Sequence, residues 1–564
     1  MKVKDFPYVR FELSEAKEGF EKFEKAMKEA KSVDDVLKAR EEVLKIMDKY
    51  STNGGLAYTR YTLNTRDEFY LKEQMYYDEI GPQMSLYFVK YADLMMDSPF
   101  RAELEKVLPE TIFPRYICEK KCHGEAIVED EQEENSIVTE YSQLMSQMTT
   151  EWRGEQKTLS YIRGFLEDKD RNVRREAALA IDKMLSEHSQ QLDDIYDRLV
   201  KVRTKMAKKL GYENYVEMGY NRMSRIDYDR DMVETFRENV KKDLVPVVAR
   251  LKKETAKALG IEDFKFYDND VIEGEGNPRP KLDEQGILAA AKEMYDEMSP
   301  VTGKFMDKML DAEAFDVTAR EGKWGGGYCT CFDTFKQPFI LANFNGSAGD
   351  VDVVTHEYGH GLAMNFVFDY GDPEAGIGSP ETAETHSMSM EFFAEKYMDK
   401  FFEDPDAYRY YHLASSLTFI PYGVIIDEFQ HIVYSNPDMT PAERKQAYLD
   451  LEKKYRPYLD YEGLPYLSQG TRWQYQMHVY ESPFYYIDYC LAQVVALEFF
   501  ADSLTDYDDA LNRYFDHCRR GGKYAFNKLV QLAGLKSPFA EGALKETADK
   551  VSVVLEELRS KVVK

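Results

Sequence analysis

Two histidines separated by three residues constrain this chain more than any other feature. They belong to the stretch His356-Glu357-Tyr358-Gly359-His360. Residues four apart lie on the same face of an α-helix, so His356 and His360 can turn ring nitrogens toward one point in space. Glu357 is the next residue around the helix and can reach that same point. The stretch therefore predicts a helix that offers two metal-binding nitrogens beside a carboxylate.

The flanking residues predict where this helix begins and ends. Residues 338–344 are apolar and are followed by Asn345-Gly346, as expected of a strand and the turn after it. Ser347 and Asp350 resemble a capping box and predict a helix start between them. The helix should then continue to Gly371. An H-E-x-x-H motif inside such a helix is typical of zinc metallopeptidases, in which the glutamate is the general base.

A catalytic zinc site needs a third protein ligand and an open fourth position. Ser379-Pro380 resembles the start of a second helix, which would carry Glu381, Glu384 and Glu391. We choose Glu384 as the ligand, and Glu391 could support a ligand imidazole from the same helix face. His386 is another possible nitrogen ligand, although it points to a different side of the helix. The alternative is that these glutamates are solvated surface groups.

An aromatic segment between residues 478 and 489 carries a second group of candidates. Ser482-Pro483 predicts a helix start, after which one apolar stripe should be buried, formed by Phe484, Ile487, Leu491 and Val494. Tyr485, Tyr486 and Tyr489 lie off that stripe and could face a cleft. Phenol and imidazole groups can donate hydrogen bonds to a developing oxyanion. The alternative is that these are interior tyrosines that bond to backbone groups.

Taken together, these segments resemble the active-site pattern of the thimet oligopeptidase family. That pattern is H-E-[FLY]-G-H followed by E-x-x-S-x-x-x-E, matched here at residues 356–360 and 384–391. The closer resemblance is to the bacterial oligoendopeptidase F branch. The resemblance rests on specific motifs between about residues 320 and 500. The remaining, helical part of the chain resembles the family only in a general way.

The resemblance implies a role for each candidate residue. One zinc ion per chain would be held by His356, His360 and Glu384, with Glu357 as the general base. His478 and either Tyr486 or Tyr489 would stabilise the oxyanion. Tyr480 would contact the substrate from a loop, and we assign Tyr485 to substrate binding as well.

The predicted fold is mainly α, with two helical lobes around a deep substrate channel and a small β-sheet next to the H-E-x-x-H helix. The lobes and the channel are implied by the resemblance. We divide the chain into an N-terminal helical lobe, 1–150, and a zinc metallopeptidase region, 151–564, with its motif core at 320–500. The strand at 339–344 should offer its edge to a peptide. The clearest loop is expected at 267–280.

The predicted function is zinc-dependent endopeptidase activity on internal bonds of short, unstructured oligopeptides. Two alternatives remain open. The first is a zinc-dependent carboxypeptidase, which would release only C-terminal residues. The second is a non-catalytic peptide-binding relative, against which the intact Glu357 argues, because a binding protein needs no general base.

Composition excludes several other classes of protein. The 564 residues include 74 basic and 102 acidic side chains, and a net charge of −28 argues against nucleic acid as a partner. No apolar run reaches membrane-spanning length and the N-terminus lacks a leader, so we predict a cytoplasmic protein without a membrane partner. Six cysteines are too few for a disulfide framework. Cys118, Cys122 and His123 could form one corner of a metal site, but no second ligand pair follows, and free thiols are expected.

Overall fold

The computed structural model describes residues 1–272 and 276–562 and confirms a mainly α-helical fold with small sheets. The first part contains α1 (Leu13–Glu29), α2 (Val33–Leu63), α3 (Glu68–Met96), α4 (Arg101–Val107), α5 (Ile112–Cys122) and α6 (Val128–Gln147). A hairpin of β1 (Thr149–Trp152) and β2 (Glu155–Thr158) follows. Next come α7 (Leu159–Arg163), α8 (Arg171–Glu187), α9 (Ser189–Lys209), α10 (Tyr215–Arg222), α11 (Arg230–Asn239) and α12 (Val245–Ala258). Residues 273–275 of the predicted loop 267–280 lie outside the described residues.

The second half of the chain carries the sheet and the motif helices. It runs through α13 (Glu284–Met298), α14 (Pro300–Asp311), β3 (Phe315–Thr318), β4 (Tyr328–Phe332), β5 (Gln337–Phe344), α15 (Gly349–Tyr370) and α16 (Pro380–Ala394). It ends with α17 (Pro405–Ser435), α18 (Pro441–Tyr455), α19 (Met477–Glu481), α20 (Tyr486–Ser503), α21 (Tyr507–Arg520), α22 (Phe526–Leu532) and α23 (Ala543–Val562). None of the described helices combines the length and apolar character needed to cross a membrane.

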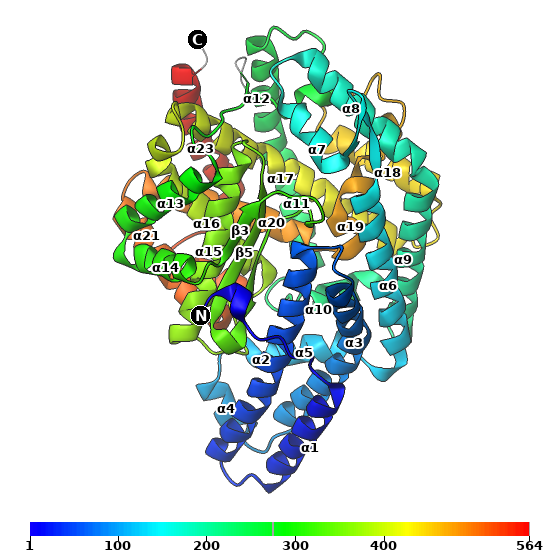
Figure 1. Cartoon of the computed structure of the whole chain (residues 1–564), viewed down its shortest axis with the longest axis vertical. Helices are drawn as coiled ribbons and strands as arrows, with labels where there is room; N and C mark the ends of the chain where they lie inside the picture. The colour runs from blue at the N-terminus through cyan, green and yellow to red at the C-terminus, as the bar shows by residue number, and fades with distance from the viewer. Residues whose placement is uncertain (273–275, 563–564) are drawn as a thin grey trace.

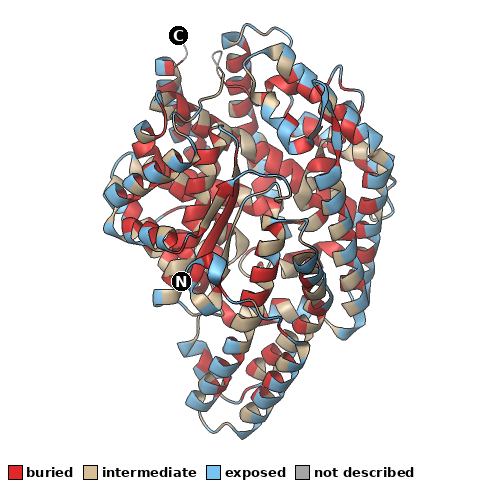
Figure 2. Cartoon of the chain, in the orientation of Figure 1, coloured by how far each residue is buried: buried red, intermediate tan, exposed pale blue. Residues whose placement is uncertain are grey.

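The N-terminal helices have a hydrophobic core of their own. α1, α2 and α3 pack on one another and form the lower end of the molecule in Figure 1, with α5 against α3. Their buried apolar side chains lie between Phe11 and Tyr116, joined only by Ala375 from the rest of the described chain. A much larger core extends through the remaining helices and the three-stranded sheet. Within that sheet β5 is almost entirely buried, whereas most residues of β3 and β4 are only half-buried, as the colours of Figure 2 indicate.

The three-stranded sheet corrects one sequence-based prediction. Its order is β3-β5-β4, with β5 parallel to β3 and antiparallel to β4. The strand predicted at 339–344 is present as β5, but both of its edges are already paired. It therefore cannot add a peptide strand, as we had expected, because its backbone groups bond to its neighbours. The sheet edges that remain are those of β3 and β4.

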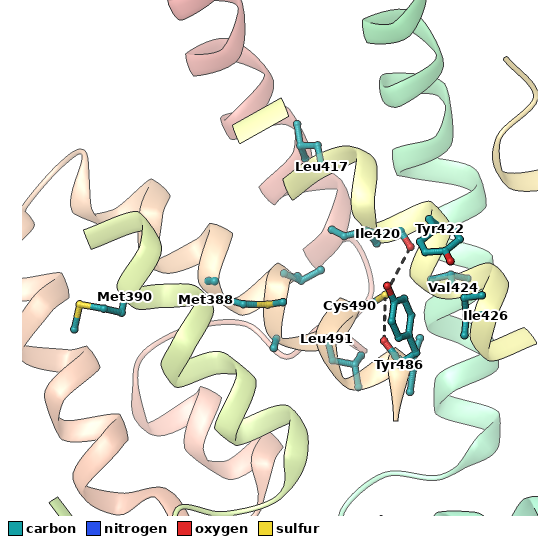
Figure 3. Packing of buried hydrophobic residues seen from close by; sticks show 14 of the residues in the cluster. Met388, Met390, Leu417, Ile420, Tyr422, Val424, Ile426, Tyr486, Cys490 and Leu491 are labelled. Atoms are coloured by element: carbon teal, nitrogen blue, oxygen red, sulfur yellow. Dashed lines mark hydrogen bonds between the residues drawn. The ribbon is translucent and has the colours of Figure 1, made fainter. Parts of the chain in front are cut away.

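Close packing holds the two motif helices together. α15 lies against α16, and α16 in turn packs against α20. A Cβ atom at Gly359 would lie 2.6 Å from the His386 carbonyl oxygen, so only glycine permits this approach between α15 and α16. α17 and α20 are also in close contact. Figure 3 shows the hydrogen bond that the Cys490 thiol donates to the Ile420 carbonyl oxygen, over a distance of 3.7 Å.

The helix boundaries agree with the sequence for α15 and α16 and differ for α20. α15 ends before Gly371 and α16 begins at Pro380, as predicted. The expected capping box before α15 does not form, because the Asp350 carboxylate accepts hydrogen bonds from the backbone of residues 345 and 346 instead. α20 begins at Tyr486 rather than at Ser482-Pro483, since Phe484 adopts a left-handed conformation with φ 70°.

Candidate metal centre and active site

Three side chains from α15 and α16 converge on one point. The Glu384 Oε2 atom lies 3.2 Å from His356 Nε2 and 3.4 Å from His360 Nε2. Two nitrogen or oxygen ligands bound to one tetrahedral zinc ion at about 2.0–2.1 Å would lie roughly 3.3 Å apart. All three ligand atoms fall within 4.8 Å of one another. The donor set and its spacing therefore fit a catalytic zinc ion, which takes two imidazoles and one carboxylate in other enzymes.

Glu357 lies beside this cluster in a buried position. Burial raises the pKa of its carboxyl group, and the neighbouring His356 and His360 act in the opposite direction. The backbone N–H of Cys329, on β4, also acts to lower this pKa. Glu357 thus lies between the metal ligands and the sheet. A carboxyl group with a raised pKa is suited to take up a proton and later release it.

A chain of imidazoles and carboxylates extends behind His356 and is fully buried only at its far end, at His412 and Glu395. Its Nδ1 atom lies 2.6 Å from Glu391 Oε1, and the other Glu391 oxygen lies 2.8 Å from His412 Nε2. His412 Nδ1 lies 2.8 Å from Glu395 Oε1. The sequence suggested that Glu391 supports a ligand imidazole, and the structure places it in hydrogen-bond contact with one. His412 and Glu395 were missed, because His412 comes from α17 and no local pattern links it to the motif.

Glu384 is also held from its other side. The Tyr485 hydroxyl donates to Glu384 Oε1 at 2.7 Å, and the Ser387 hydroxyl donates to Glu384 Oε2 at 3.0 Å. Burial opposes ionisation of Glu384, but His360 and His356 outweigh it and lower its pKa well below the usual value. The carboxylate is therefore ionised and oriented. Tyr485, which the sequence suggested as a peptide contact, bonds to the glutamate instead.

His478 and Tyr489 form a pair of potential hydrogen-bond donors. The Tyr489 oxygen lies 3.4 Å from His478 Nε2. On the other side of the ring, His478 Nδ1 lies 3.0 Å from the Gln476 side-chain nitrogen, and Tyr422 donates to the Gln476 oxygen at 2.7 Å. Burial lowers the pKa of His478 to about 4 and raises that of Tyr489. At neutral pH both groups are therefore uncharged, and the phenol keeps its proton.

Tyr486 is more enclosed than the other two tyrosines. Its ring centroid lies 5.0 Å from that of His478, but only 8% of the residue is exposed. It packs against Phe419 and Tyr422 on α17, at centroid distances of 5.7 and 5.8 Å. The predicted buried stripe of α20 is confirmed, and Tyr486 lies next to it rather than facing a cleft.

The prediction for Tyr480 is wrong. It lies in α19 rather than in a loop, and it is completely buried. Its ring stacks on Tyr141 with centroids 3.9 Å apart, and its hydroxyl donates to the Leu192 carbonyl oxygen. A bound peptide could not reach such a side chain. The backbone around Tyr480 is nevertheless held in place, because its carbonyl oxygen accepts a hydrogen bond from Arg203 at 2.5 Å.

His386 is not part of the metal cluster. Although it follows Glu384 by two residues, its ring is turned to the opposite side of α16 and is completely buried. There it meets the ring of His517 from α21, with centroids 5.2 Å apart. The cluster formed by His356, His360 and Glu384 does not include it.

Fold and site together define a mainly helical protein whose H-E-x-x-H helix contributes to a cluster of side chains that could hold a metal ion. A model of peptidase family M3 matches residues 164–549, and a model of the peptidase M3 N-terminal domain matches residues 3–123. The chain belongs to peptidase family M3. This confirms the family that the sequence motifs indicated.

Individual relatives agree with this assignment. Oligopeptidase PepF of Bacillus subtilis (strain 168) is 24% identical over 420 residues, which cover 71% of this chain and 59% of the relative. Group B oligopeptidase PepB of Streptococcus agalactiae serotype III (strain NEM316) is 26% identical over 39% of this chain and 37% of its own length. The chain therefore matches less than two thirds of either curated relative. The solved structure of PZ peptidase A with inhibitor 2 superposes with a TM-score of 0.96, 41% identity and 99% coverage of both chains.

Proposed function

We propose that this protein is a zinc-dependent endopeptidase that hydrolyses internal bonds of short, unstructured oligopeptides. The observation that carries the proposal is the convergence of His356, His360 and Glu384 with a buried carboxylate, Glu357, directly beside them. Membership of peptidase family M3 supports the reaction class. Oligopeptides are the proposed partners, one catalytic zinc ion per chain is the proposed cofactor, and a cytoplasmic location stays a prediction.

Each residue of the site would have a separate role in peptide hydrolysis. Zinc, when held by the three ligands, would polarise a carbonyl group and make a water molecule more acidic. Glu357 would accept the proton of that water as the carbonyl carbon is attacked, and then deliver it to the leaving amine. Its raised pKa favours this exchange of one proton in both directions. Glu391 would keep the His356 ring oriented through its Nδ1 atom.

His478 and Tyr489 are our proposed donors to the oxyanion. Both are uncharged at neutral pH, and they lie within 3.4 Å of each other. The negative charges of Glu384 and Glu357 also raise the pKa of Tyr489, which indicates that its hydroxyl lies near the reacting groups. Uncharged donors held in a fixed geometry stabilise negative charge that develops in the transition state. Tyr486 is the weaker choice, since its ring packs against α17.

The free edge of β4 is our proposed binding surface for the peptide backbone. In the antiparallel register, Cys329 faces Ile340, whose N–H donates to Ala314 on the β3 side at 2.9 Å. Cys329 must therefore turn its own backbone groups away from β5, toward the open edge. That edge lies next to Glu357, because the Cys329 backbone N–H is close enough to lower the pKa of its carboxyl group. A peptide that adds to β4 as an extra strand would bring its carbonyl groups beside Glu357.

The domain division at residue 150 also stays a proposal, together with two lobes around a substrate channel. The separate hydrophobic core of residues 11–116 supports an N-terminal helical unit. A channel between such units would admit short flexible peptides and exclude folded proteins.

Mass spectrometry of products from a peptide mixture tests the proposal. We expect cleavage at internal bonds, its loss after treatment with a chelator, and its recovery when zinc is restored. The Glu357→Gln protein should keep its zinc and lose about 10²–10⁴-fold in turnover, because only the general base is removed. A matched folded protein that contains the same peptide sequences should stay intact. Near-normal turnover by metal-loaded Glu357→Gln would rule out the proposed mechanism.

The same experiment separates the two alternatives. A carboxypeptidase would release single residues from the C-terminus and spare peptides whose C-terminus is amidated. A non-catalytic peptide-binding relative would retain peptides without cleaving any. Products with new internal ends exclude both.

A further inference from the structure

A second group of metal-binding side chains lies at the end of α5. Glu119, Cys122 and His123 each direct one ligand atom into a common space, and these three atoms lie within 4.8 Å of one another. His123 Nε2 and Glu119 Oε2 are 3.6 Å apart, close to the roughly 3.3 Å expected for two ligands of one tetrahedral zinc ion. Among the described residues, only this cluster and the catalytic one meet that geometry.

The histidine of this cluster is oriented in the same way as a catalytic ligand. His123 Nδ1 lies 2.7 Å from Glu131 Oε1, just as His356 Nδ1 lies 2.6 Å from Glu391. The carboxylate fixes the ring so that Nε2 faces Cys122 and Glu119. Metal-binding histidines almost always carry such a partner on the other nitrogen. Glu131 is buried and is itself held by Arg222 at 3.2 Å, so the orientation is rigid.

The surroundings of the cluster also favour a cation. Cys122 is the last residue of α5, and His123 caps that helix, where unpaired carbonyl groups create negative potential. The Cys122 thiol is almost completely buried, while the Glu119 side chain is 40% exposed. One side of the cluster is therefore open, which leaves an entry path and a fourth position for water.

We propose that Glu119, Cys122 and His123 form a second divalent-cation site, separate from the catalytic centre, that takes zinc. A thiolate, an imidazole and a carboxylate form a donor set suited to a borderline-soft cation and unsuited to magnesium or calcium. The sequence alone offered only Cys118, Cys122 and His123, without enough ligands. The fold supplies Glu119 one helical turn before His123, and Glu131 from α6.

A cation at this position would connect separate parts of the fold. α5 packs against α3 of the N-terminal core, whereas Glu131 belongs to α6 and Arg222 to α10. At its other end, α5 holds the loop between α15 and α16 through Arg115, which donates to the carbonyl oxygen of Glu374 at 2.9 Å. Occupancy would therefore stiffen the helix that supports the connection between the two catalytic helices.

Metal titration of the full-length protein tests this site. After complete removal of metal, we expect wild type to bind two zinc ions per chain, and Glu119→Gln and Cys122→Ser to bind one. Glu384→Ala should also bind one, because it removes the other site. Cys118→Ser is the matched control, since this buried thiol lies one turn away and outside the cluster, and it should bind two.

Cobalt provides a second measurement that needs no activity. The catalytic cluster contains no sulfur, so a thiolate-to-cobalt charge-transfer band can arise only where a cysteine binds the metal. The band should appear in wild type, Cys118→Ser and Glu384→Ala, and disappear in Cys122→Ser. The inference is overturned if wild type binds a single zinc ion, or if Cys122→Ser keeps both equivalents or the band. Glu119→Gln covers the case in which Cys122→Ser fails to fold, because the Glu119 side chain is 40% exposed and the Cys122 thiol is buried.

Discussion

Replacing His412 by phenylalanine should weaken zinc binding without touching a metal ligand. His412 joins two carboxylates, with Glu391 2.8 Å from one ring nitrogen and Glu395 2.8 Å from the other. Phenylalanine keeps a ring in contact with its aromatic neighbours, Phe392 and Tyr408, whose centroids lie 4.8 and 5.7 Å away. The substitution therefore removes the hydrogen bonds and preserves most of the packing.

The expected magnitude follows from the two lost contacts. A hydrogen bond to a charged group contributes about 1.5–3 kcal/mol, so two of them set an upper limit of about 3–6 kcal/mol on the loss of folding free energy. Protonation of Glu395, whose pKa is already raised by burial, should relieve part of this cost. Loss of a partner that orients a ligand histidine typically lowers metal affinity about 10–100-fold, and Glu391 is that partner for His356.

Two measurements and one control decide this prediction. Competition with a chelator of known affinity gives the zinc Kd, and thermal unfolding of the metal-free protein gives the stability. Tyr408→Phe is the control, because its hydroxyl bonds to Asp352 and not to the chain behind His356. It should lower Tm and leave the Kd unchanged. If His412→Phe loses stability but binds zinc as tightly as wild type, Glu391 does not depend on His412 and the reasoning is wrong.

Three further predictions test other parts of the site and fold. Glu384→Ala should lose the catalytic zinc ion, one of the two equivalents, in metal analysis, while Glu381→Gln, on the same helix outside the cluster, should keep both; the reverse would refute the ligand assignment. Tyr489→Phe should lower kcat by about 10²–10³-fold with little change in KM. Tyr480→Phe should instead leave kcat unchanged in the same steady-state assays and cost about 1 kcal/mol of stability. Burial opposes ionisation of Glu134, but two neighbouring arginines outweigh it and depress its pKa to about 2. This depressed pKa contributes about 3 kcal/mol of stability that is present above pH 4.5 and is lost as the pH falls toward 2. Urea unfolding should therefore show the gap between wild type and Glu134→Gln narrowing with acid, and parallel curves would contradict the pairing.

Local sequence rules were sufficient for the core of the candidate site. His356 and His360 are four apart, and the geometry of one helix places their rings together whatever surrounds them. Pro380 and Gly371 predicted the ends of α16 and α15, because proline and glycine act on their own backbone. Glu384 was chosen from its place on the predicted second helix and agreed with the family pattern, and its oxygen lies close to both imidazoles.

Tertiary structure decided the features that depend on distant partners. The apolar pattern of 338–344 predicts a strand, but only its pairing with β3 and β4 shows that β5 is central. Tyr480 and Tyr489 lie in the successive helices α19 and α20, yet Tyr480 is enclosed by α6 and α9 whereas Tyr489 faces His478. His412 enters the site only because α17 packs against the end of α16. Spacing within a helix is set by covalent geometry, whereas burial, strand order and contacts between helices far apart in sequence arise only when the whole chain is packed.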